Sequence, residues 1–112
     1  YLRQKGDKGE ETAIRYLQRK GYAILARNYH IRYAELDIIA KFKQTLVFIE
    51  VKAYDKPQFI HPLEVMTKRK LKRMYLAASA YLQDKGITNT DCRLDLIIVY
   101  RDKVTDHLEG LS

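Results

Sequence analysis

The sequence has a single cysteine, Cys92, among its 112 residues. One cysteine excludes a disulfide within the chain and a cysteine-based metal cluster, and it is typical of a reducing compartment, so we expect a cytoplasmic protein. No apolar run approaches the length that spans a membrane, and nothing resembles a signal peptide. Repeats and low-complexity tracts are also missing. We therefore expect one soluble domain, residues 1–112, without membrane contact.

Histidines are few, and acidic residues are outnumbered. His30, His61 and His107 are scattered and belong to no motif, which disfavours a histidine-based nuclease. The 21 Lys and Arg residues exceed the 14 Asp and Glu residues, which gives a net charge of +7. This excess predicts a polyanionic partner such as nucleic acid, although many basic proteins bind nothing anionic. The oligomeric state stays open, with a homodimer as one alternative.

Two short apolar runs predict an antiparallel hairpin at the centre of the chain. Residues 36–42 and 46–51 are rich in Ile, Val and Phe and are joined by Lys43-Gln44. A two-residue loop there sets Ile38 opposite Ile49. Because Lys43-Gln44 is not the Asn-Gly expected of a tight turn, a loop longer by one or two residues is the alternative, and a slip of one residue would move one strand's charges to the other face.

Four charged residues extend this hairpin on one face. The register sets Asp37 opposite Glu50 and Glu35 opposite Lys52, and residues directly opposite lie about 5 Å apart at Cβ. Sheet interiors do not collect charges without a use or a partner. Carboxylates that face each other are typical ligands of Mg²⁺ or Mn²⁺, so we predict a metal site at Asp37, Glu50 and the backbone carbonyl of Val51. Glu35 is the expected structural partner of Lys52, and plain surface ion pairs are the alternative.

The first predicted helix carries one acid on its inward face. It covers about residues 7–20, with Asp7 as its cap and Gly21 at its end. Glu10 continues the apolar stripe of this helix toward the N-terminus. A favourable charge near the helix start would explain an acid here, but not its inward position.

The other elements predict a mixed sheet flanked by helices, an α/β fold. A meander of three antiparallel strands followed by a crossover helix and a further strand gives this architecture. In chain order we expect a strand at 22–33 that is bulged around Asn28, the hairpin, a loop at 53–62, a helix at 63–85 that ends at Gly86, a strand at 92–100 and an edge strand at 104–108.

The second predicted helix carries a strongly basic run at residues 68–73, which predicts nucleic-acid binding. Lys70 lies nearest the packed stripe of this helix, so it is less easily explained as solvated charge than its neighbours. A solvated helix face is the alternative for the whole run. The predicted phosphate contacts are Lys68, Arg69, Lys70, Lys72 and Arg73.

An ordered set of short motifs covers about residues 9–100. It consists of Gly9-Glu10-Glu11-Thr12-Ala13, Arg27-Asn28-Tyr29, Glu35-Leu36-Asp37-Ile38-Ile39, Val47-Phe48-Ile49-Glu50-Val51-Lys52, Lys70 and Arg93-Leu94-Asp95. This set resembles the YraN-like family of bacterial proteins, and through it the PD-(D/E)xK nuclease superfamily and its Holliday-junction resolvases.

The resemblance implies a restriction-endonuclease-like fold of order α-β-β-β-α-β and a catalytic set. Asp37, Glu50 and Lys52 match the superfamily's catalytic aspartate, acidic residue and lysine, and Glu10 matches the extra glutamate of resolvase-like members. It implies a Mg²⁺-dependent endonuclease acting on DNA, including branched or structured DNA. A non-catalytic nucleic-acid-binding module of nuclease descent and an RNA-processing subunit are the alternatives.

Overall fold

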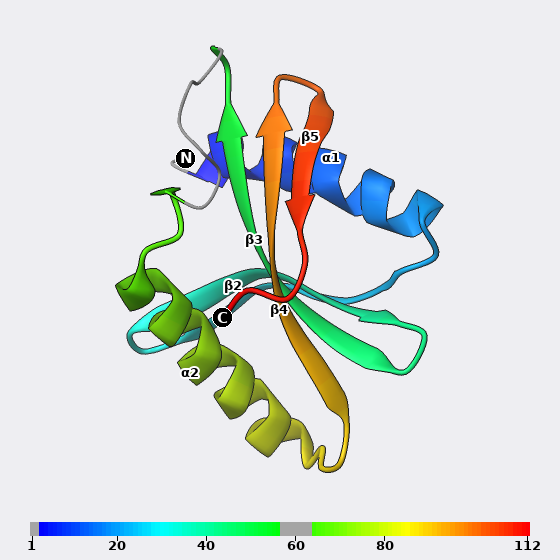
Figure 1. Ribbon diagram of the computed structural model, residues 1–112, viewed down its shortest axis with the longest axis vertical. Helices are drawn as coiled ribbons and strands as arrows, with labels where there is room; N and C mark the ends of the chain where they lie inside the picture. Colours follow the sequence, from blue (N-terminus) through cyan, green and yellow to red (C-terminus); the bar gives the residue numbers. More distant parts are fainter. Residues whose placement is uncertain (1–2, 57–63) are drawn as a thin grey trace.

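The computed structural model describes residues 3–56 and 64–112 as two helices and one mixed sheet (Figure 1). The sheet order is β1-β2-β3-β4-β5, and every neighbouring pair is antiparallel except β3 and β4, which are parallel. This confirms the predicted α/β mixed sheet. The elements are α1 (Arg3–Arg19), β1 (Ala23–Ile31), β2 (Ala34–Phe42), β3 (Thr45–Tyr54), α2 (Lys68–Lys85), β4 (Asp91–Tyr100) and β5 (Lys103–Leu108).

The two helices cover opposite faces of the sheet (Figure 1). Successive residues of a strand point to opposite faces, so adjacent residues such as Ile38 and Ile39 enter different core clusters. The α1 side takes Ile38, Ala40, Val47 and Ile49. The α2 side takes Leu36, Ile39, Leu46 and Phe48. Neither helix of the described chain is long and apolar enough to cross a membrane.

The β2–β3 hairpin has the predicted register. Phe42 pairs with Thr45 and Ile38 with Ile49, so the loop is Lys43-Gln44 alone. Lys43 takes a positive φ of 55°, which supplies the left-handed residue that a two-residue hairpin loop needs without Gly or Asn. The ladder ends at the Ile38–Ile49 pair. Beyond it, β2 continues beside β1 while β3 continues beside β4, so the two strands separate at a point that we call the fork.

Strand β1 is irregular at two positions. Asn28 has a left-handed φ of 52°, in agreement with the irregularity expected there. The register shift itself lies elsewhere, between Ile24 and Ala26. This shift was not predicted, because the apolar residues on either side of it alternate over too few positions to reveal a change of register.

The predicted start of the first helix was wrong, while the predicted ends of both helices were close. Helix α1 begins at Arg3, so Asp7 lies inside the helix and not at its cap. Helix α2 begins at Lys68, where the Thr67 hydroxyl accepts a hydrogen bond from the Lys70 N–H at 3.1 Å. Threonine is a favoured N-cap because its oxygen satisfies an N–H of the first turn. Gly86 ends α2 with a left-handed φ of 65°, as predicted.

The remaining boundaries moved by one or two residues. Strand β3 runs to Tyr54, two residues into the predicted loop at 53–62. The rest of that loop from Pro57 to Pro62, like the predicted helix start at Leu63, lies outside the described residues. The strand predicted at 92–100 gains Asp91, and the edge strand predicted at 104–108 is confirmed as β5 with Lys103 added.

A buried aspartate ties β4 to β5 and to the C-terminal residues. Asp95 is 0% exposed and accepts hydrogen bonds from Arg93 Nε at 2.9 Å and from the Gly110 N–H at 3.1 Å. His107 Nε2 lies 2.7 Å from its other oxygen, and His107 Nδ1 lies 2.8 Å from the Tyr16 hydroxyl. Burial alone would raise the pKa of Asp95, but these hydrogen bonds and the Arg93 charge hold it below its usual value. The network therefore connects α1 through Tyr16, β4 through Asp95 and β5 through His107, and its role is to hold these elements together.

Candidate functional site

The fork brings a carboxylate to the backbone of the neighbouring strand. Asp37 Oδ2 accepts a hydrogen bond of 2.7 Å from the N–H of Val51. Val51 lies two residues beyond Ile49, at the position where the next hydrogen-bonded pair of the β2–β3 ladder would fall. The Asp37 carboxylate therefore accepts the hydrogen bond that a backbone carbonyl of β2 would accept if the ladder continued. The N–H and C=O of one strand residue point to the same side, so the Val51 carbonyl also faces the fork.

Asp37 and Glu50 form an electrostatically strained pair. Burial, together with the charge of Glu50 and a hydrogen bond between the two carboxyls, raises the pKa of Asp37 to about 8. The Val51 N–H opposes this rise, and Glu10 contributes a further repulsion. Two acids that repel each other in a half-buried position form a site where positive charge is favoured.

A lysine supplies part of that positive charge. Lys52 Nζ lies 3.0 Å from Glu50 Oε2. Burial alone would lower the pKa of Lys52, but the adjacent Glu50 outweighs it, so the pKa is raised and the lysine stays charged. Lys70 of α2 lies next to Lys52, and burial together with that neighbouring charge lowers the pKa of Lys70. Its ammonium also donates to the Val65 carbonyl at 3.3 Å.

Glu10 reaches the same region from the other face of the sheet. Its side chain is only 8% exposed, as the apolar stripe of the helix predicted, and one oxygen lies 3.8 Å from the guanidinium of Arg27. The preceding residue makes this position possible, because a Cβ on Gly9 would lie 2.6 Å from the Cβ of Ala53. Glycine therefore lets α1 lie directly on β3 and brings Glu10 within electrostatic range of Asp37.

The structure assembles most of the predicted site, with one correction. Glu35 does not hold Lys52: it pairs with His30 of β1 and is exposed, while Lys52 pairs with Ile98 of β4 and contacts Glu50. The prediction failed because it continued the β2–β3 ladder past the fork. The residues that the structure does bring together are Glu10, Asp37, Glu50, Val51, Lys52 and Lys70.

The basic start of α2 divides into two groups. Lys70 and Arg73 face the sheet and line a cavity that also includes Glu50. Lys68, Arg69 and Lys72 are exposed along the outside of the helix. The helix therefore presents cations both toward the carboxylates and toward solvent.

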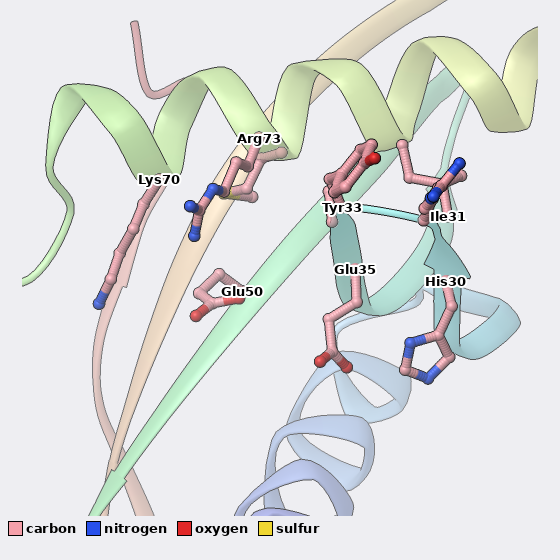
Figure 2. Close-up of a pocket in the computed structure, with 10 residues that line it drawn as sticks. His30, Ile31, Tyr33, Glu35, Glu50, Lys70 and Arg73 are labelled. Atoms are coloured by element: carbon pink, nitrogen blue, oxygen red, sulfur yellow. The ribbon is translucent and has the colours of Figure 1, made fainter.

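An open cavity of about 370 Å³ lies beside the fork, between α2 and the turn that joins β1 to β2 (Figure 2). Lys70 and Arg73 reach down from α2 toward Glu50, while Tyr33 and Glu35 enter from the turn and the start of β2. Tyr33 was not among the site residues predicted from the sequence. The available signal was its position: a large aromatic residue in a tight turn, where Gly, Asn or Asp is usual.

The described residues contain no group of three His, Cys, Asp or Glu side chains arranged to hold a metal ion. The site at the fork offers two such side chains, Asp37 and Glu50, with the Val51 carbonyl beside them. Mg²⁺ is commonly bound through one or two carboxylates, with waters and substrate oxygens completing its shell. The donors present are therefore sufficient for Mg²⁺ and insufficient for a closed structural metal site.

The fold and the fork define the class of this protein: a small α/β domain with an acidic pair and lysines on a mixed five-stranded sheet. The sequence profile of the uncharacterised protein family UPF0102 matches residues 9–99, so the chain belongs to that family, which confirms the YraN-like assignment.

Relatives from distant bacteria support this membership. A UPF0102 protein of Chlorobium phaeobacteroides strain BS1 is 45% identical over 90% of this chain and 80% of its own length. One from Clostridioides difficile strain 630 is 40% identical over 88% of this chain and 86% of its own length. One from Kosmotoga olearia is 41% identical over 97% of this chain and 93% of its own length.

Proposed function

We propose that this protein is a metal-dependent endonuclease that hydrolyses phosphodiester bonds of DNA, including branched or structured DNA. The observation that carries the proposal is the acidic pair Asp37 and Glu50 at the fork, with Lys52 on the same face and 3.0 Å from Glu50. The resemblance of these three residues to the catalytic set of the PD-(D/E)xK superfamily supports the same reading. The net charge of +7 suits a polyanionic substrate.

The acidic pair fits a divalent cation. Burial and the charge of Glu50 raise the cost of ionising Asp37, which a bound Mg²⁺ or Mn²⁺ would relieve. Such an ion supplies charge neutralisation at the phosphate and lowers the pKa of its bound water. Asp37, Glu50 and the Val51 carbonyl would hold it, and the Val51 N–H fixes the orientation of the Asp37 carboxylate.

The remaining charged residues would orient the attacking water, stabilise charge on the phosphate and bind the DNA backbone. Lys52 keeps its charge because of Glu50, so it can orient the attacking water or stabilise the charge that develops on the phosphate. Glu10 adds negative potential from the α1 side. The cations of α2 would hold the DNA backbone beside the site.

The test is a cleavage panel with matched variants. Linear, flapped and four-way DNA and the corresponding RNA are incubated with Mg²⁺ or Mn²⁺, beside calorimetric titration with Mn²⁺. Asp37→Asn and Glu50→Gln should abolish hydrolysis and weaken Mn²⁺ binding, while DNA binding in EDTA stays equal or becomes slightly tighter because repulsion of phosphate falls. Lys52→Ala should retain Mn²⁺ binding and lose most of the rate, by about 10²-fold or more. Glu10→Gln should cost less than either acidic substitution.

Controls separate the site from general charge effects. Asp106→Asn removes an exposed carboxylate from β5 and should leave hydrolysis and Mn²⁺ binding unchanged. Mn²⁺ binding that survives Asp37→Asn combined with Glu50→Gln would place the metal elsewhere. Hydrolysis that survives the same double variant would rule out the proposed site.

A non-catalytic nucleic-acid-binding module is the second candidate, and two observations favour it. Among the residues described, no three-ligand group occurs, and Lys52 already neutralises part of the Glu50 charge. In that case the wild type binds DNA with the same basic surface but takes up no Mn²⁺ and cuts no substrate in the panel. The two outcomes of the Mn²⁺ titration therefore distinguish the candidates.

A further inference from the structure

We infer that the cavity beside the fork holds a single unpaired nucleotide of the DNA, next to the bond that is cut. This inference rests on the proposed function, because it names the feature of the DNA that the same site recognises. It assigns roles to Tyr33, Arg73 and Lys70 that neither the acidic pair nor the family membership provides.

Tyr33 offers an aromatic face at the mouth of the cavity (Figure 2). It is 74% exposed, more than any other large hydrophobic residue of the described chain, and it sits in the turn between β1 and β2. The Arg32 guanidinium lies 5.3 Å from the centre of its ring. Nucleobases stack on exposed aromatic rings without regard to sequence, and arginine strengthens such platforms.

The charged side chains around this cavity match the parts of a nucleotide, with cations for its phosphates and an acid for its base. Lys70 and Arg73 line the α2 side, where they can contact the phosphates of the nucleotide. Glu50 lies on the opposite side and belongs to the acidic pair, so a phosphate held by Lys70 lies at the fork. Glu35 is exposed in the wall of the cavity and can accept hydrogen bonds from an exocyclic amino group of a base.

Size and stacking explain why the nucleotide is unpaired. The cavity volume of about 370 Å³ suits one small ligand and not a double helix. Both faces of a base inside a duplex are covered by its neighbours, so only a base that has left the stack can place a face on Tyr33. Positions next to a bulge, a gap or a branch provide such a base at the lowest cost of unstacking.

The experiment compares two duplexes that differ only in pairing. One contains 2-aminopurine opposite thymine, and the other contains 2-aminopurine as a single-nucleotide bulge. Binding is measured in EDTA by the polarisation of a dye at the far end, and stacking by quenching of 2-aminopurine fluorescence. We expect the wild type to bind the bulged duplex about tenfold more tightly and to quench its 2-aminopurine.

Variants at two exposed tyrosines provide the control. Tyr33→Ala should remove the preference and the quenching while affinity for the paired duplex is retained, and Tyr33→Phe should restore both. Tyr75 of α2 is 63% exposed but does not line this cavity, so Tyr75→Ala should behave as the wild type. Because Tyr33 is largely exposed, its variants should melt at the wild-type temperature.

Equal affinity for the two duplexes would overturn the inference, and so would a preference that survives Tyr33→Ala. Binding of the free 2-aminopurine nucleotide as tightly as the bulged duplex would also overturn it, because the cavity would then be a mononucleotide site. The binding assay contains no divalent ion, so it judges the cavity independently of catalysis. If the wild type and Tyr33→Ala cleave the substrates of the panel equally well, the proposed function stands and this inference is overturned.

Discussion

A Cβ atom added to Gly9 would lie 2.6 Å from the Cβ of Ala53, so helix α1 touches strand β3 with no space for any side chain between them. Real Cβ atoms are essentially never that close. The contact lies one residue before Glu10, which is buried at the fork. The position of this acid therefore depends on a glycine that contributes no chemistry of its own.

Gly9→Ala should destabilise the protein although alanine favours a helix more than glycine by about 1 kcal/mol. The forced displacement of α1 should cost about 1–3 kcal/mol in unfolding free energy, as measured by urea denaturation. Ala53→Gly removes the clashing atom, so the double variant should be more stable than Gly9→Ala alone. Additive effects of the two substitutions would show that this contact does not limit the approach of α1.

Asp37→Asn should stabilise the protein at pH 8 and not at pH 4, when measured in EDTA. The pKa of Asp37 is about 8 in the folded chain against a usual 3.8. Between these values the unfolded chain has lost the proton that the folded chain keeps, so the free energy of unfolding falls as the pH rises. Asparagine has no such dependence, and each 1 kcal/mol gained should raise the melting temperature by about 4–8 °C.

The matched control for this experiment is Asp106→Asn, which changes an exposed aspartate of β5. Its melting temperature should follow the wild type across the pH range. A constant difference between Asp37→Asn and the wild type from pH 4 to pH 8 would contradict the raised pKa.

Asp95→Asn should be among the most destabilising substitutions in the chain. The substitution removes the negative charge that Arg93 and His107 contact. Position 95 is 0% exposed, so water cannot replace that charge. Removing one partner of a buried ion pair typically costs about 3–5 kcal/mol. Urea denaturation measures the loss, and a value below about 1 kcal/mol would mean that the network contributes little to stability.

Replacing Lys68, Arg69 and Lys72 by Ala should weaken DNA binding and flatten its salt dependence. Each lost phosphate contact should reduce the slope of log K against log salt by about 0.7–0.9. The control variant replaces Lys41, Lys43 and Lys103 by Ala. These lysines are exposed on the hairpin and on β5, and their replacement removes the same amount of positive charge. Equal slopes for the two triple variants would mean that the start of α2 is only a solvated face.

The core of the site was predictable from the sequence because the hairpin is symmetric about Lys43-Gln44. Once Phe42 pairs with Thr45, the register sets Ile38 opposite Ile49, and Asp37 and Glu50 are the next residue of each strand beyond this last pair. Glu10 was predictable for a similar reason, since helical periodicity alone turns it inward.

Other features depend on contacts that no local pattern records. The misplacement of Glu35 shows this, because nothing in residues 34–42 indicates that the part of β2 before Ile38 does not pair with β3. The cavity combines a turn with a helix more than thirty positions further along the chain, so its walls meet only in the folded protein. The helix starts were missed for a simpler reason: Thr67 has the chemistry of an N-cap, but the apolar pattern was extended through it.

The irregularities of β1 also matter for association between molecules. β1 and β5 are the outer strands of the sheet, and regular outer strands invite edge-to-edge pairing and fibrous aggregation. The register shift between Ile24 and Ala26, followed by the left-handed Asn28, interrupts the flat edge that such pairing needs. At the other side, β5 is only six residues long and carries Lys103 and Asp106. Both edges are therefore protected, and self-association by continuing the sheet from one molecule into the next is disfavoured.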